Sequence, residues 1–210
     1  MLPLDLVLSF FSISVLLALS PGPDNVFVLM QSMLWGRKAG FWVVLGLCTG
    51  LIGHTFAVTI GLAAVFAASA TAFNTIKWLG AAYLLYLAWC AFKAKPQQSQ
   101  NTLQKHTNLP ARVLYRRGII MNLTNPKVSL FFLAFLPQFT SSARGSVALQ
   151  TISLGALFML ATLLIFGAIA IFSASFGAIL QKSARAQTWL HRATGTVFIA
   201  LALHLALANR

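Results

Sequence analysis

Apolar residues run through this chain in six long stretches, and each stretch is separated from the next by a short polar segment. Each stretch approaches or exceeds the roughly 20 apolar residues that are needed to cross the hydrocarbon core of a bilayer. The stretches lie near residues 4–35, 40–68, 73–92, 118–139, 147–173 and 188–208. The pattern predicts an all-α membrane protein with six transmembrane helices.

The overall composition also indicates a bilayer as the solvent. The chain is 59% hydrophobic and only 8% charged, whereas an average soluble domain is about 25% charged. The longest polar segment, residues 93–117, is too short for a core of its own, so we expect a single transmembrane domain over residues 1–210. The first stretch follows no basic segment of the kind that opens a cleavable signal, and it is expected to remain in the mature protein.

The two cysteines indicate neither a metal site nor a cofactor. Cys48 and Cys90 both fall inside apolar stretches and lack the C-x-x-C spacing of redox or zinc sites. We expect them to be small buried hydrophobic residues. Intramembrane enzymes need several acidic residues or a nucleophile with a partner, and the two acidic residues of the chain do not meet that need. No enzyme activity and no cofactor are expected.

The basic residues are sorted between alternate loops, and this sorting predicts the orientation. Segments that follow the first, third and fifth stretches contain Arg37, Lys38, Lys93, Lys95, Lys105, Arg112, Arg116, Arg117, Lys182, Arg185 and Arg192. The opposite side has only Lys77, Arg144 and Arg210. By the positive-inside rule the first group is cytoplasmic, including the loop 93–117, and both termini are periplasmic in a bacterial inner membrane. This sorting accounts for the net charge of +13 without nucleic acid as a partner.

The first and the fourth stretch are both interrupted by proline. The sequence S-P-G-P-D-N, with Pro21, Gly22 and Pro23, breaks the first stretch, and L-T-N-P-K, with Pro126, breaks the fourth. The chain therefore divides into two repeats of three spans, residues 1–92 and 118–210. Because three is odd, the second repeat must enter the membrane from the opposite side, which is the inverted-repeat plan of many secondary transporters.

Both breaks are predicted to approach the middle of the membrane. At 1.5 Å per residue, Pro23 lies roughly 20 Å and Pro126 roughly 14 Å from the cytoplasmic edge. Discontinuous helices that meet at such depth form the substrate site in many transporters. A binding site is therefore expected where the two breaks meet.

Asp24 is the strongest candidate for a functional side chain. The chain has two acidic residues, and since Asp5 sits at the outer margin, Asp24 is the carboxylate of the membrane core. An ionisable residue at that depth is expensive and marks function. Asp24 could bind a substrate ammonium or exchange a proton with it. The alternative is a structural role as the cap of the helix that starts after Pro23.

Lys127 is the corresponding candidate at the second break. Asn125 and Pro126 suit the N-cap and first positions of a new helix, whose N-terminal dipole, together with Lys127, would attract a carboxylate. Two alternatives remain open, namely snorkelling of Lys127 to the cytoplasmic surface and a direct ion pair between Lys127 and Asp24.

His54 and Asn122 are further candidates. His54 lies about midway along the second stretch, where it could relay protons or serve as a structural histidine bonded to a neighbouring helix. Asn122 lies one turn before the second break. The glycines that precede His54, at positions 46, 50 and 53, allow close helix packing, either within the chain or in a homodimer.

Three motifs together resemble the LysE/RhtB family of amino-acid exporters. They are S-P-G-P-D-N in the first stretch, K-W-L-G-A-A-Y-L-L-Y-L in the third, and M-N-L-T-N-P-K with F-L-P-Q-F in the fourth. The resemblance spans essentially the full chain. It implies a six-helix inner-membrane transporter that expels amino acids such as lysine, arginine, threonine, homoserine or leucine, driven by the proton gradient. The family signatures fall on Pro21, Gly22, Pro23 and Asp24, and on Asn122, Asn125, Pro126 and Lys127.

One difference within the resemblance bears on the substrate. Some members of the family carry Asp where this chain has His54, so the chain is more similar to the homoserine and threonine type. A single core carboxylate beside Lys127 and two histidines also favours a neutral amino acid over a cationic one. An exporter of basic amino acids or of another small metabolite, and a channel or structural subunit without proton coupling, remain as alternatives.

Overall fold

The computed structural model describes residues 2–68, 70–94, 109–173 and 183–207. Within these ranges the chain is helical and contains no strand. The α-helices are α1 (Leu4–Leu19), α2 (Pro23–Trp35), α3 (Arg37–Ala68), α4 (Ala70–Lys93), α5 (Ala111–Leu123), α6 (Pro126–Leu130), α7 (Val147–Ile171) and α9 (Ala184–Leu207). Three short elements, η1 (Phe131–Phe135), η2 (Leu136–Phe139) and η3 (Ser142–Arg144), connect α6 to α7.

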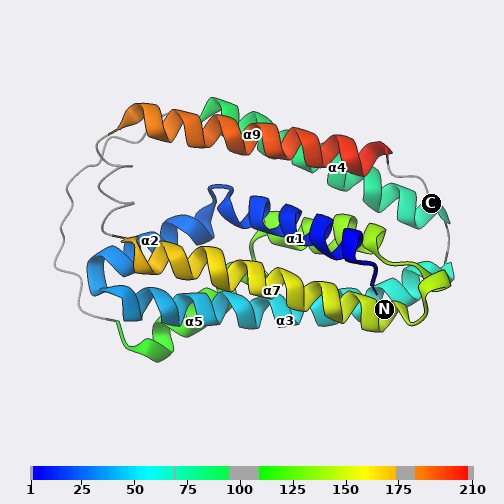
Figure 1. The fold of residues 1–210 in the computed structure, drawn as a ribbon, viewed down its shortest axis with the longest axis horizontal. Helices are drawn as coiled ribbons and strands as arrows, with labels where there is room; N and C mark the ends of the chain where they lie inside the picture. The colour runs from blue at the N-terminus through cyan, green and yellow to red at the C-terminus, as the bar shows by residue number, and fades with distance from the viewer. Residues whose placement is uncertain (1, 69, 95–108, 174–182, 208–210) are drawn as a thin grey trace.

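The helices lie roughly along the long axis of the molecule and alternate in direction (Figure 1). The start of α1, the junction of α3 with α4, the start of α7 and the end of α9 gather at one end. The junction of α2 with α3, the end of α4, and the starts of α5 and α9 gather at the other. The first residues of α1 and the last of α9 therefore lie at the same end.

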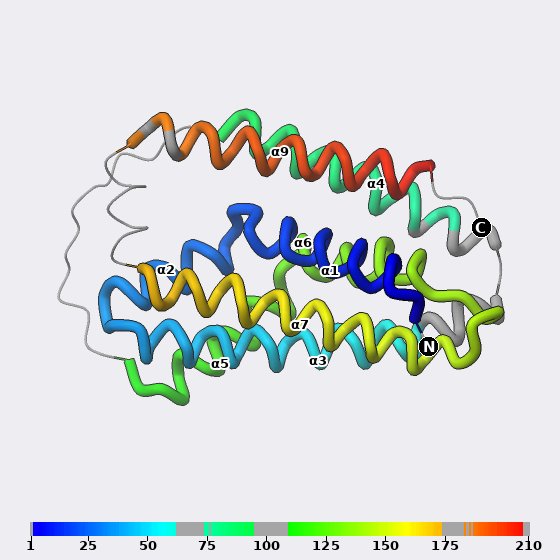
Figure 2. The backbone as a smooth tube through the Cα atoms, in the orientation of Figure 1, coloured from blue at the N-terminus to red at the C-terminus, as the bar shows by residue number. Residues whose placement is uncertain are grey.

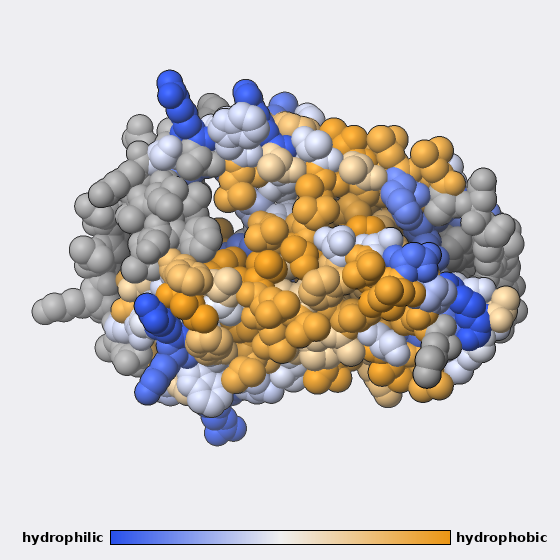
Figure 3. Space-filling model, viewed as in Figure 1, coloured by the Kyte–Doolittle hydropathy of each residue, from blue (hydrophilic) through white to orange (hydrophobic). Residues whose placement is uncertain are grey.

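Several helices are long and apolar enough to cross a bilayer. Among the described residues these are Arg37–Gly61 of α3, Val147–Ile171 and Gln187–Leu207, and the count rises from 3 to 5 if α1 with α2, and α5 with α6 to η2, each form one bent span. Helix α4, which is not among these spans of the described residues, packs along α9. A broad apolar band covers the middle of the molecule, while hydrophilic residues lie toward its ends (Figure 3).

Each apolar stretch predicted from the sequence coincides with one helix or one bent pair, but two details of the prediction were wrong. The segment 93–117 is not a loop throughout, because α5 starts at Ala111, directly after Pro110. Arg112, Arg116 and Arg117 are exposed on this helical extension. Proline suits the position before a first helical turn, and charged side chains allow a helix to continue beyond the apolar layer. Residues 95–108 of the segment lie outside the described residues.

The second detail concerns the conformation of the fourth stretch after its break. It does not continue as one α-helix to residue 139 but passes from α6 into a π-helical turn, η1, and then a 3₁₀ turn, η2. Pro137 stands in η2, and proline cannot donate the hydrogen bond that an α-helix needs there. The segment Phe131–Phe139 therefore packs as an irregular, phenylalanine-rich block.

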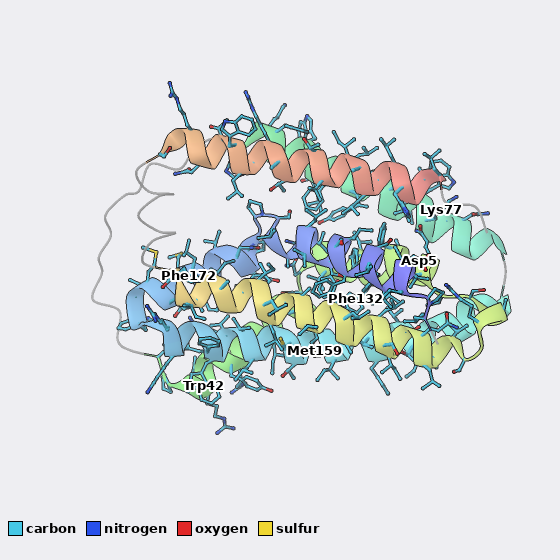
Figure 4. The ribbon with its side chains drawn as sticks, viewed as in Figure 1. Asp5, Trp42, Lys77, Phe132, Met159 and Phe172 are labelled. Atoms are coloured by element: carbon cyan, nitrogen blue, oxygen red, sulfur yellow. The ribbon has the colours of Figure 1, made fainter. Side chains whose placement is uncertain are left out.

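The buried apolar residues form two clusters. The larger is built around this phenylalanine-rich block, with Phe10, Phe131, Phe132, Phe135, Phe139 and Phe158 among its members. The smaller contains residues of α2, α3, α5 and α7, such as Val28, Leu47, Leu114 and Phe166. Figure 4 places Phe132 near the middle of the molecule, and Asp5 and Lys77 toward the end where α1 starts. The polar residues described below lie between these two clusters.

The predicted glycine ladder packs within the chain, between α3 and α5. A Cβ atom at Gly46 or at Gly118 would collide with the backbone of the opposite helix. One turn further, Gly50 leaves the space that the side chain of Asn122 occupies, and Gly53 faces Leu123. Small residues let two backbones approach closely in this way, and here they bring α5 and its break against α3.

We expect Gly118→Ala to destabilise the protein, because its methyl group meets the Val43 carbonyl and the Gly46 Cα. Overpacking of this kind costs about 1–3 kcal/mol, which corresponds to a fall in Tm of roughly 2–10 °C for a chain of this size. The matched control is Gly61→Ala, since no atom lies within 4 Å of a Cβ there. Thermal unfolding of the detergent-solubilised proteins tests this, and equal Tm values for the two variants would refute it.

Candidate functional site

The two helix breaks predicted from the prolines are present. Helix α1 ends at Leu19 and α2 begins at Pro23, with a bend of 61°, and the break between Leu123 and Pro126 bends the chain by 49°. Gly22 is fully extended between the first two helices, with φ −163° and ψ 178°. Both bends lie away from the two ends of the bundle (Figure 2). The chain is thus interrupted twice within its apolar layer.

The first break exposes backbone carbonyls at the end of α1, and side chains bind most of them. The Lys127 ammonium donates to Ser20 O at 2.9 Å and to Leu17 O at 3.2 Å. Asn25 Nδ2 donates to Ala18 O at 2.8 Å. The last carbonyls of a helix have no partner within the helix, and in an apolar layer each must find one elsewhere. Lys127, which belongs to the second break, therefore satisfies carbonyls of the first break.

The carbonyls at the end of α5 are also bound by side chains. Thr124 Oγ1 donates to Ile120 O at 2.8 Å, and Asn122 O lies 3.2 Å from His54 Nε2. A carbonyl only accepts, so Nε2 carries the proton in this bond. His54 also packs against Phe132, with 5.6 Å between ring centroids. The predicted bond of His54 to a neighbouring helix is therefore present.

Asp24 is buried at the first break, with 3% of its surface exposed. Its Oδ2 accepts a hydrogen bond of 2.9 Å from Asn125 Nδ2, across the two breaks. Its Oδ1 is buried and makes no hydrogen bond with the described residues. The N-cap of α2 is Gly22, with no capping side chain, so the alternative that Asp24 is a helix cap is wrong.

Lys127 is buried as well, with 7% of its surface exposed. The alternative that its side chain snorkels to the surface is therefore wrong. Asn125 caps α6 as predicted, because its Oδ1 accepts a hydrogen bond of 3.0 Å from Lys127 N, and Pro126 occupies the first turn. The ammonium binds carbonyls of α1 and forms no direct ion pair with Asp24. Two of its three N–H donors are used in this way.

Asp24, Lys127 and Asn122 line the same small cavity. Its volume is about 10 Å³, which is the room that about one water needs. Residues of both core clusters complete it, including Leu17 and Phe158 from the larger and Leu47 and Phe166 from the smaller. Asn122 Oδ1 and Asp24 Oδ1 are both buried and have no hydrogen-bond partner among the described residues. The cavity therefore offers acceptors from two elements and an ammonium from a third.

The structure brings four of the predicted site residues together, namely Asp24, Asn122, Asn125 and Lys127. His54 binds the backbone of Asn122 and is not one of the residues that line this cavity. The sequence analysis missed Asn25 and the wall that α7 supplies with Phe158, Thr162 and Phe166. Thr162 offered a weak signal, as a polar residue in a very apolar stretch. No group of three metal-binding side chains occurs in the described part of the chain.

Comparison with known proteins agrees with this geometry. A family model described as LysE type translocator matches residues 15–209. The chain is 32% identical over 196 residues to the homoserine/homoserine lactone efflux protein of Salmonella typhimurium, covering 93% of each chain. It is 29% identical over 209 residues to the uncharacterized membrane protein YrhP of Bacillus subtilis, covering 96% of this chain and 99% of that one.

A shorter match involves the leucine efflux protein of Salmonella choleraesuis, at 33% identity over 126 residues, or 60% of this chain and 59% of that one. No solved structure matches the chain significantly. The family model covers nearly the whole chain, including both breaks and the cavity between them. The chain therefore belongs to the LysE family of translocators and is a multi-pass membrane protein.

Proposed function

We propose that this protein exports a neutral amino acid of the threonine or homoserine type across the inner membrane, in exchange for protons. The observation that carries the proposal is the buried Asp24, which keeps one carboxylate oxygen without a partner among the described residues, at a small cavity where two broken helices meet. Buried ionisable groups within a membrane mark substrate and proton pathways. The efflux proteins related to this chain give the substrate class.

The polar groups of the cavity suit the two charged groups of an amino acid. The ammonium of the substrate would bind Asp24 Oδ1 and Asn122 Oδ1, which are otherwise unpartnered. Its carboxylate would bind the third N–H of Lys127, at the N-terminal end of α6. One site carboxylate and one site ammonium balance a substrate without net charge, whereas a second positive charge on lysine or arginine would have no partner here.

Asp24 also provides a group for proton exchange. When the substrate ammonium leaves, an ionised carboxylate in an apolar layer becomes expensive. Binding a proton removes that cost, and release of the proton restores the acceptor for the next substrate. The same oxygen then binds the proton and the substrate in alternation, which is the requirement for antiport.

The cavity is much smaller than an amino acid, so transport requires that the helices around it open. An inverted repeat would supply that motion. In support of such a repeat, each element packs against its counterpart: α3 against α7, α4 against α9, and the first break against the second. On this plan α4 is the third span of the first repeat, so six spans cross the membrane.

The described basic residues support the proposed orientation. Arg37, Lys38, Lys93, Arg112, Arg116, Arg117, Arg185 and Arg192 belong to α3, α4, α5 and α9, each of which starts or ends at one end of the molecule. At the opposite end lie Lys77, within α4, and Arg144. The positive-inside rule makes the first end cytoplasmic, which places both termini in the periplasm.

The function is tested by loading cells that overexpress the chain with radiolabelled threonine, homoserine, leucine, lysine or arginine and measuring efflux. We expect rapid efflux of threonine or homoserine that an uncoupler abolishes. Asp24→Asn should reduce it by about 10- to 100-fold, the effect of losing a charge-assisted hydrogen bond, while insertion in the membrane is unchanged. The control is Asp5→Asn, which removes the other acidic residue, an exposed one at the end of the bundle.

Uncoupler-sensitive efflux at the normal rate from Asp24→Asn cells would exclude this carboxylate as the coupling group. Efflux of lysine or arginine alone would show that the substrates are basic amino acids. Efflux at the same rate with and without the uncoupler would indicate a channel.

Lys127→Met should lower stability as well as transport, because it leaves Leu17 O and Ser20 O without donors. Each buried unsatisfied carbonyl costs about 1–3 kcal/mol. We expect a clear fall in Tm in detergent compared with Lys38→Met, which removes the same charge from an exposed position at the start of α3. A Lys127→Met protein as stable as the control would contradict the capping role.

The orientation is tested by cysteine labelling of intact cells in a Cys48→Ala, Cys90→Ala background. Ser142→Cys, exposed in η3 at the periplasmic end, should react with a membrane-impermeant maleimide. Arg112→Cys, exposed at the start of α5, should react only after the cells are permeabilised. The reverse pattern would invert the proposed topology.

A further inference from the structure

A second pocket lies between α2 and α5, on the proposed cytoplasmic side of the breaks. Its volume is about 460 Å³, within the range of about 300–1,000 Å³ that is typical of sites for small molecules. It is lined by Pro23, Phe27, Arg117, Ile120, Met121, Thr124, Asn125 and Pro126. Unlike the small cavity, this pocket already has room for an amino acid.

The charged, apolar and polar lining residues occupy different parts of the pocket. Arg117, Ile120, Met121 and Thr124 follow the i, i+3, i+4, i+7 spacing that places residues on one face of a helix, and here this face of α5 is turned toward α2. Arg117 lies nearer the cytoplasmic start of α5, and Asn125 and Pro126 lie at the break. Phe27, Ile120 and Met121 form apolar walls between them. Of the lining residues that the structure describes, Arg117 is the charged one.

Asn125 separates this pocket from the small cavity. It lines the pocket, while its Nδ2 donates to Asp24 Oδ2. Asp24 lines the small cavity, and its neighbour Pro23 lines the pocket. The Asn125–Asp24 hydrogen bond thus stands between the space that can hold a substrate and the carboxylate oxygen that lacks a partner.

We propose that this pocket is the cytoplasmic loading site, in which Arg117 binds the substrate carboxylate before the substrate passes Asn125 to reach Asp24. The guanidinium of arginine matches a carboxylate with two parallel hydrogen bonds, and the apolar walls accept a short side chain. The inference rests on the proposed function, since it names how the same substrate is first recognised. Arg117 is a specificity residue of the loading step and takes no part in proton exchange.

The test uses inside-out membrane vesicles with an acidic interior, in which the cytoplasmic face is exposed and export appears as uptake of radiolabelled threonine. Arg117→Gln should raise KM about 10- to 100-fold, the effect of removing a charge-assisted hydrogen bond, with Vmax within about twofold of the wild type. Arg117→Lys should be intermediate. The matched control, Arg116→Gln, removes the same charge from the adjacent exposed residue, which does not line the pocket, and its KM should stay at the wild-type value.

Competition separates carboxylate recognition from a general effect of charge. Unlabelled homoserine should inhibit wild-type uptake better than threoninol, in which an alcohol replaces the carboxylate, and Arg117→Gln should lose this difference. An unchanged KM, an equal rise in Arg116→Gln, or a preference for the acid that persists in Arg117→Gln would overturn the proposal. An Arg117→Gln defect only in Vmax, which follows the anionic lipid content of the vesicles, would assign Arg117 to a lipid phosphate instead.

Occupancy of the pocket is measured directly with Met121→Cys in the Cys48→Ala, Cys90→Ala background. Threonine should slow the reaction of this cysteine with a maleimide in inside-out vesicles and should not affect Arg116→Cys. If threonine is transported but does not protect Met121→Cys, the loading site is wrong while the proposed function stands. If wild-type vesicles transport no amino acid at all, both the loading site and the proposed function are wrong.

Discussion

The structure depends on how two broken helices satisfy their free backbone carbonyls within an apolar layer. No water is available there to bind an exposed carbonyl, and each one left alone costs several kcal/mol. The carbonyls of the first break are bound by Lys127 from the second. At the second break, the backbone N–H groups of Thr124 and Asn125 bind Ile120 O and Asn122 O, and Thr124 Oγ1 and His54 of α3 add to these bonds. The first break is therefore possible only because the second lies against it, and this dependence fixes the two interruptions side by side.

The same arrangement leaves Asp24 Oδ1 without a partner among the described residues, as the proposed function requires. Lys127 is the nearest basic side chain in the cavity, yet two of its donors are bound to carbonyls of α1. Asn125 provides one neutral hydrogen bond to Oδ2 and leaves Oδ1 unpartnered. A direct ion pair would have neutralised the site internally and left nothing to exchange. Because Lys127 binds backbone carbonyls instead, the Asp24 carboxylate keeps an acceptor for the proposed proton or substrate ammonium.

The sequence predicted those features that depend on local chemistry. Proline at positions 21, 23 and 126 cannot continue a helix that precedes it, and Asn125 before Pro126 is a local capping pattern, so both breaks and the cap of α6 were predicted correctly. The partners of Lys127 were not predictable, because they depend on which carbonyls of a distant helix come within reach. The same holds for the α7 wall of the cavity, whose apolar residues look like any lipid-facing residues in the sequence. The irregular turns at Phe131–Phe139 arise from packing around Pro137, and periodicity alone does not reveal them.

The number of bonds across the breaks also indicates where the proposed site would open. The end of α1 is held to α6 by two hydrogen bonds from an ammonium, and separating them would leave two carbonyls and a charge without partners in the apolar layer. Helix α2 is joined to the second break by a single side-chain bond, from Asn125 to Asp24, and a substrate ammonium at Asp24 would replace what that bond provides. Movement of α2 relative to α6 is therefore a less costly opening than separation of α1 from α6. It would join the pocket between α2 and α5 to the cavity at Asp24 while the capped end of α1 stays in place.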